Sequence, residues 1–161
     1  MRPHVCLSRL HKTPQAATVL RLIPLAWLLL AGCSGPQWEW DFREAKRKAA
    51  AANRPLFLYF NDWIDPTSAR MQNEVLRTPE GRDLLVDTIN VWVEVGIHRD
   101  IAEQYHIRRA PAYVVAKPNG DPVDRYPGIP TLDAFVSRVT RAKERAVPAP
   151  ATKSNGTTEA R

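Results

Sequence analysis

Cysteine is almost missing from this chain, because Cys6 and Cys33 are its only two and none follows position 33. The part of the chain beyond Cys33 therefore forms no disulfide within itself and offers no thiolate for nucleophilic or redox chemistry. Any activity that depends on a cysteine pair in this part is excluded.

Negative charge is missing from the first 33 residues, which hold Arg2, Arg9, Lys12 and Arg21 but no Asp or Glu. The formal charge of +6 falls to +2 when this segment is set aside, with 19 basic against 17 acidic side chains. A basic surface of the folded part is therefore weakly supported, and we expect no nucleic-acid partner.

Long apolar runs are also missing. The longest, "LIPLAWLLLAGC", is shorter than the roughly 20 residues that span a bilayer and is typical of a secretory signal. Its end, "LAGC", resembles the bacterial lipobox, which predicts a signal peptide at residues 1–32 and lipidation of Cys33. An ordinary secretory signal, or a buried segment with a chance cysteine, remains the alternative. Ser34 resembles the residue that sends lipoproteins to the outer membrane, so we expect an anchored protein of the bacterial cell envelope facing the periplasm.

Loss of the signal would remove Cys6, and acylation would occupy Cys33. Acyl chains add about 0.8 kcal/mol of membrane affinity per buried methylene, which anchors a soluble domain. The mature protein would then have no free thiol, although its compartment permits disulfides.

The rest of the chain divides into a tether (33–41), a domain (42–146) and a tail (147–161) that is predicted to be disordered. Within the domain, strong helix formers, continuous or alternating apolar runs and an Asn-Gly turn predict a regular order of elements. The expected helices are near 44–52, 67–77, 78–87, 100–107 and 131–146, and the expected strands near 56–61, 88–97, 112–117 and 122–128. The fold class is α/β, with a central mixed sheet of about four strands flanked by helices.

Three segments in this order resemble the thioredoxin family. "RPLFLYFNDWIDPTSARMQNEV" resembles the strand, C-x-x-C loop and helix of the active site, "YHIRRAPAYVV" resembles the cis-proline segment, and "KPNGDPVDRYPG" resembles the terminal hairpin. The resemblance implies a thioredoxin-like domain in which the redox pair is replaced by Asp65, Pro66, Thr67 and Ser68. Trp63 lies one residue early for the family's tryptophan, so the register of this loop is open by one position.

A carboxylate and a hydroxyl cannot replace thiolates in disulfide exchange. Asp65 followed by Pro66 is instead a good helix start. Ser68 would need a base to act as a nucleophile, and His98 and His106 belong to no recognisable catalytic motif. Nor do these histidines have the close spacing that indicates a metal site. We therefore predict no catalytic residue, metal or cofactor.

The resemblance also implies that the bond between Ala110 and Pro111 is cis, and that the backbone at Ala110 can bind an extended peptide. Trp63, Ala110 and Pro111 are thus candidate peptide-binding residues, while a proline required only by the fold is the alternative. Arg108 and Arg109 favour an acidic partner, unless they are simply solvated loop charges.

These observations lead to a redox-inactive, lipid-anchored thioredoxin-like protein that binds an unidentified protein or peptide of the cell envelope, or assembles with it. One alternative is a thiol-disulfide oxidoreductase, which the missing thiols disfavour. Another is a structural spacer that acts through its tail.

Overall fold

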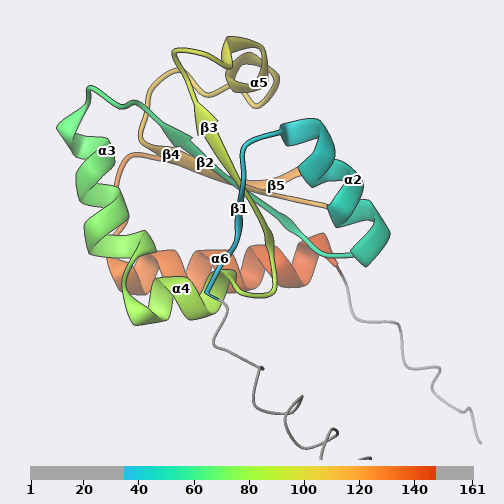
Figure 1. The fold of residues 1–161 in the computed structure, drawn as a ribbon. Helices are drawn as coiled ribbons and strands as arrows, with labels where there is room; N and C mark the ends of the chain where they lie inside the picture. Colours follow the sequence, from blue (N-terminus) through green and yellow to red (C-terminus); the bar gives the residue numbers. More distant parts are fainter. Residues whose placement is uncertain (1–34, 148–161) are drawn as a thin grey trace, which may run out of the picture. The chain divides into compact units, whose positions relative to one another are not determined.

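The computed structural model describes residues 35–147. The predicted signal peptide, the lipidation site Cys33 and all of the predicted tail after Val147 lie outside the described residues. The described part forms a sheet with helices on both faces (Figure 1). No helix in residues 35–147 is both long and apolar enough to cross a membrane.

The centre of the sheet is β2 (Leu56–Asn61), whose six residues are all buried. It pairs in parallel with β3 (Ile89–Glu94) and antiparallel with β4 (Ala112–Ala116). The order across the sheet is β1-β3-β2-β4-β5, with β1 (Trp38–Glu39) and β5 (Pro122–Pro127) at the two edges. The predicted mixed sheet is confirmed.

Two cores form because successive side chains of β2 point to opposite faces of the sheet. Leu56, Leu58 and Phe60 pack with α2 (Phe42–Ala52) and α5 (Arg99–Gln104). Phe57 and Tyr59 pack on the other face. The elements covering that face are α3 (Pro66–Met71), the π-helical turn η2 (Gln72–Leu76), α4 (Pro79–Leu85) and α6 (Leu132–Ala146).

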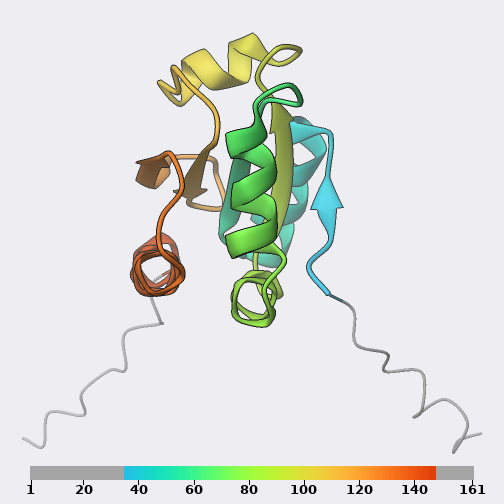
Figure 2. The same cartoon turned by 90° about the vertical axis from the view of Figure 1, so that its left-hand side faces the viewer.

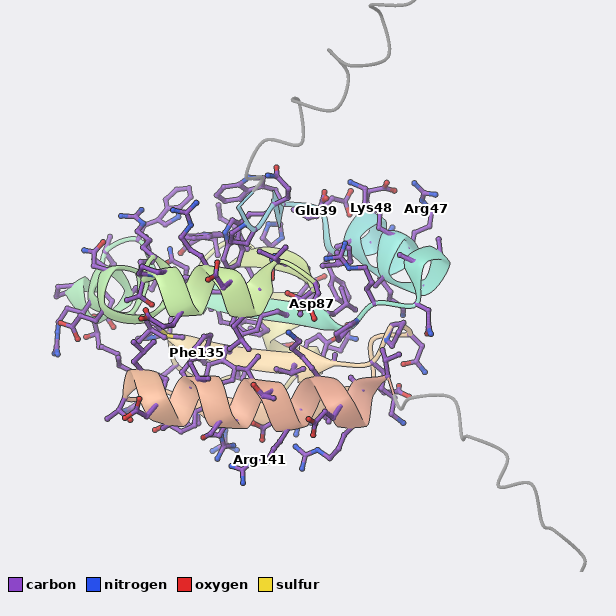
Figure 3. The ribbon with its side chains drawn as sticks, turned by 90° about the horizontal axis from the view of Figure 1, so that it is seen from below. Glu39, Arg47, Lys48, Asp87, Phe135 and Arg141 are labelled. Carbon is purple, nitrogen blue, oxygen red and sulfur yellow. The ribbon has the colours of Figure 1, made fainter. Side chains whose placement is uncertain are left out.

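Helices α2, α3, α4 and α6 begin where the sequence supplies an oxygen cap, whereas α5 follows His98, whose side chain makes no capping hydrogen bond. The Asp41 carboxylate accepts hydrogen bonds from the amides of Arg43 and Glu44 at the start of α2. The Thr131 hydroxyl accepts one from the Ala134 amide at the start of α6. Phe135 points from α6 toward the sheet and Arg141 points away (Figure 3), so the helix is amphipathic in place.

The sheet has five strands rather than the expected four or so, because Trp38 and Glu39, in the predicted tether, pair with Asn90 and Val91 of β3. The Trp38 ring packs edge-on against Phe57 and two other aromatic rings, those of Tyr59 and Trp92. Glu39 also forms an ion pair with Lys48 of α2 at 2.7 Å (Figure 3). The start of the sheet thus lies inside the segment that the sequence suggested was a tether.

Trp38→Ala should lower the free energy of unfolding by about 3 kcal/mol, because it removes a large ring from an aromatic cluster. Trp40→Ala is the matched control, since the Trp40 side chain is 62% exposed. That change should cost less than about 1 kcal/mol. Urea denaturation followed by circular dichroism measures both, and a loss for Trp38→Ala no larger than that for Trp40→Ala would contradict the stabilising role of the Trp38 ring.

Candidate functional site

The candidate site lies where β2 and β3 end. These parallel strands are in register, with Asn61 opposite Glu94, so the loops that follow them leave the sheet side by side. The loop after β2 (residues 62–65) and helix α5 after β3 occupy the same end of the sheet (Figure 1 and Figure 2). The carboxyl ends of parallel strands commonly carry the binding residues of α/β folds.

Buried polar side chains hold the backbone of the loop after β2. The Asn61 side-chain amide donates to the Glu94 carboxyl group at 2.7 Å, and the Trp63 backbone amide donates to the other oxygen of that group at 3.3 Å. Gln72 completes the cluster by donating to the Asn61 side-chain oxygen at 3.1 Å. Because Asn61 and Glu94 are both buried, these bonds have little competition from water.

Asp65, Pro66, Thr67 and Ser68 form the start of α3. The Asp65 carboxylate accepts a hydrogen bond from the Thr67 amide at 2.8 Å, and Pro66 occupies the first turn. Hydrogen bonds from the Thr67 side chain and then its amide lower the pKa of Asp65. Ser68 is buried, and its hydroxyl oxygen accepts from the Asp62 amide at 3.2 Å. Both polar groups are thus engaged in shaping the loop.

Tyr59 lies beneath this loop with its ring buried. Its hydroxyl donates to the backbone carbonyl of Ser68 at 2.9 Å, and burial raises the pKa of Tyr59 to about 12. The hydroxyl therefore stays neutral at physiological pH. Tyr59, Asn61 and Glu94 were not predicted from the sequence as site residues. The one sequence signal for Asn61 and Glu94 is that each is a polar residue at the end of an apolar strand.

Ala110 and Pro111 lie beside the same loop. Phe60 of β2 pairs with Ala112, the first residue of β4. Ala110 and Pro111 directly precede Ala112, so they run alongside the end of β2, where the loop begins. The bond between Ala110 and Pro111 is cis, as the resemblance implied, and the Pro111 carbonyl accepts from the Gly128 amide at 2.7 Å. Within residues 35–147, the Ala110 amide and carbonyl make no hydrogen bond. They remain available to another chain.

Exposed apolar side chains gather at this end of the sheet. The exposed fraction is 67% for Trp63, 90% for Ile64 and 63% for Ile97. Trp63 and Ile64 follow β2, and Ile97 follows β3, where its amide donates to the Glu94 carbonyl at 3.1 Å. Only two other large apolar side chains of the described part, Trp40 and Val86, are similarly exposed.

The histidines are separate from this loop. His98 immediately precedes α5 and His106 follows it, and neither makes a hydrogen bond to Ser68 in the described part of the chain. Across residues 35–147, no three His, Asp or Glu side chains gather in a way that could hold a metal ion. Arg108 and Arg109 are exposed just ahead of Ala110.

A family model described as a thioredoxin-like domain matches residues 42–143. The chain belongs to the thioredoxin-like family. The resemblance inferred from three sequence segments is therefore confirmed, and it extends over nearly all of the folded part.

Solved structures agree on the fold of this thioredoxin-like domain. A thioredoxin from Thermus thermophilus has a TM-score of 0.63 and 22% identity, over 70% of this chain and 91% of its own. A DsbH oxidoreductase has a TM-score of 0.57 and 21% identity, over 86% and 95%. The DsbD C-terminal domain of Neisseria meningitidis in its reduced form has a TM-score of 0.55 and 17% identity, over 62% and 92%. A search of curated proteins found no match.

Asp65→Ala should destabilise the domain at neutral pH, because α3 loses its cap. The folded pKa of Asp65 is lowered, so its stabilisation is complete above the ordinary value of 3.8 and disappears as pH falls through the folded pKa. The difference between wild type and variant should therefore shrink in acid. Urea denaturation at pH 7 and pH 3 measures it. Asp65→Ser, which keeps a capping oxygen, should be less destabilised, and a gap for Asp65→Ala that is as large at pH 3 would contradict the capping role.

Asn61→Ala should lower the free energy of unfolding by about 2 kcal/mol, because the buried Glu94 carboxyl group loses its shortest donor. Adding Glu94→Leu to this variant should cost less than Glu94→Leu costs in wild type. A double-mutant cycle by urea denaturation measures this coupling, which we expect to exceed about 1 kcal/mol. Strictly additive losses would mean that the two side chains act independently.

Proposed function

We propose that this thioredoxin-like protein is a redox-inactive binding module that docks an extended segment of another envelope protein. In this proposal Cys33 carries the lipid anchor, and the domain works on the periplasmic side of the outer membrane. The bound segment lies across Trp63, Ile64 and Ile97 and pairs with the backbone at Ala110.

Redox inactivity is supported by the missing nucleophile. Disulfide exchange requires a thiolate both to attack and to leave, and no cysteine follows Cys33. The residues in place of the cysteine pair have other partners: Asp65 caps α3, and the buried Ser68 hydroxyl holds the Asp62 amide. Within residues 35–147, neither side chain forms a hydrogen bond with a histidine that could act as its base.

The observation that carries the proposal is the exposed apolar surface on a firmly held loop. Trp63 and Ile64 are exposed at a position where the backbone is fixed by a buried carboxyl group. Isolated exposed apolar side chains are ordinary, but a group on adjoining loops suggests a binding surface. Tryptophan is also the residue that most often dominates interface energies. A rigid loop lowers the entropy lost when a partner binds.

In this proposal, hydrogen bonds to the Ala110 backbone fix the orientation of the bound segment. An extended segment can donate to and accept from the Ala110 peptide groups, as in strand addition. Its alternate side chains would then face the apolar surface beside Pro111. The bound segment would need no cysteine of its own.

The names of the structural relatives include an oxidoreductase, which supports the enzymatic alternative. At identities below 25% the likeness extends to the fold, and catalysis depends on residues at the site. An insulin reduction assay with the purified protein tests this alternative. Turnover above the uncatalysed rate would overturn redox inactivity.

Trp63→Ala should abolish capture of a specific envelope protein by the full-length, C-terminally tagged protein in mild detergent. Trp40→Ala is the matched control, because the exposed fraction is 62% for Trp40 and 67% for Trp63, while Trp40 lies far along the chain from the loop. Quantitative mass spectrometry of cross-linked complexes measures the loss, which we expect to be at least tenfold because central interface tryptophans are commonly worth about 2 kcal/mol or more.

Removal of the residues after Ala146 tests whether the tail makes the contact instead. We expect this truncation to leave capture unchanged. If the partner is lost with the tail and kept with Trp63→Ala, the spacer alternative is correct and the docking surface is not the loop.

A further inference from the structure

A basic pocket adjoins the proposed peptide-binding backbone. Its volume is about 470 Å³, and its polar lining consists of His106, Arg108, Arg109 and Arg125, with Ile107 and Pro127 among the apolar residues. The first three come from the link between α5 and β4, and Arg125 comes from β5. Two elements distant in sequence therefore bring positive side chains to one hollow, and no acidic residue lines it.

The arginine side chains of this pocket have no hydrogen-bonding or ion-pair partner among the described residues. Within residues 35–147, Arg108, Arg109 and Arg125 donate no side-chain hydrogen bond and have no carboxylate within ion-pair distance. The nearby acidic groups of β5 and its turn are engaged elsewhere: Asp124 pairs with Arg138 at 2.7 Å, and Asp121 accepts from Asn119 at 2.8 Å. Within residues 35–147, no carboxylate therefore forms an ion pair with an arginine of the pocket.

His106 has a backbone conformation that is uncommon for residues other than glycine. Its φ is 55°, in the left-handed region that favours glycine, at the point where α5 ends. The His106 amide donates to the Glu103 carbonyl and the Ile107 amide to the Ala102 carbonyl, the pattern of a Schellman ending in which glycine is the usual residue. Retaining an imidazole here costs stability, which is consistent with a use for the side chain.

The pocket touches the proposed docking site. Arg109 and Ala112, which both line it, flank Ala110 and Pro111 in the chain. A segment that pairs with the Ala110 backbone has a side chain about every 3.3 Å along its length, on alternate sides. One or two of these side chains can reach the pocket while others face Trp63 and Ile64.

We propose that this pocket binds carboxylate side chains of the docked segment, so that the partner is recognised through an acidic peptide. Arginine forks bind carboxylates by paired, charge-assisted hydrogen bonds. Ile107 and Pro127 offer apolar contact to the methylene groups of the same side chains. A peptide is favoured over a phosphate or a lipid headgroup because only a peptide also uses the Ala110 backbone. This inference rests on the proposed function and adds the chemistry of its ligand.

Peptides can be selected from a random displayed library on the full-length protein in mild detergent. This experiment tests the docking function and the recognition of acidic residues separately. We expect enriched peptides that combine apolar residues with at least one Asp or Glu, and that are lost with Trp63→Ala. If no peptide is enriched, the docking function and this inference both fail. If peptides depend on Trp63 but carry no acidic residue, docking stands and the acidic recognition is wrong.

The affinity of an enriched peptide, measured by fluorescence anisotropy, then tests the pocket itself. Arg125→Gln and Arg109→Gln should each weaken binding about tenfold, because each removes a charge-assisted hydrogen bond. Arg99→Gln is the matched control, since Arg99 is an exposed arginine of α5 outside the pocket. Replacing the peptide's acidic residues by Asn or Gln should weaken binding to wild type at least as much, and should weaken binding to Arg125→Gln less than it weakens binding to wild type.

The His106→Gly variant separates a loss of peptide affinity from a loss of protein stability. Glycine suits the left-handed φ, so this variant should melt no lower than wild type while it binds the peptide roughly fivefold more weakly. Full affinity in all pocket variants would overturn the inference. So would inorganic phosphate or phosphatidylglycerol vesicles that bind the pocket more tightly than the acidic peptide, since the pocket would then serve a different anion.

Discussion

The buried carboxyl group of Glu94 is the point on which the arrangement of the site depends. It ends β3, accepts from the Asn61 side chain at the end of β2 and accepts from the Trp63 amide in the next loop. One side chain therefore ties two parallel strands to the loop that exposes Trp63 and Ile64. A change in the length or polarity of this side chain would move the apolar surface, even though Glu94 itself is hidden from any partner.

Much of the fold could be predicted from the sequence, because its main signals are local. The continuous apolar run of β2 and the capped, amphipathic α6 follow from residue pattern alone, and three segments identified the family. Strand β1 could not be found in this way, because two residues are too few to show a period. Its pairing depends on the aromatic rings of distant residues.

The candidate site was predicted less completely. The helix start at Asp65 has a recognisable pattern, and it lies where the sequence indicated. The Asn61–Glu94 contact joins residues 33 positions apart, and nothing in either local sequence shows that they meet. Likewise, Arg125 joins Arg108 and Arg109 only through the pairing of β5 with β4. Long-range pairing decides such groups, and a single sequence does not reveal it.

The prolines of β5 have a consequence for how the domain meets other chains. Pro122 and Pro127 bound this edge strand, and a proline has no amide hydrogen to offer to a strand added from outside. The opposite edge is β1, which is only two residues long. Both edges of the sheet are thus poor templates for pairing with a further strand, and copies at high local concentration would resist joining into continuous sheets. A domain whose sheet edges are protected in this way can be crowded without aggregating through those edges.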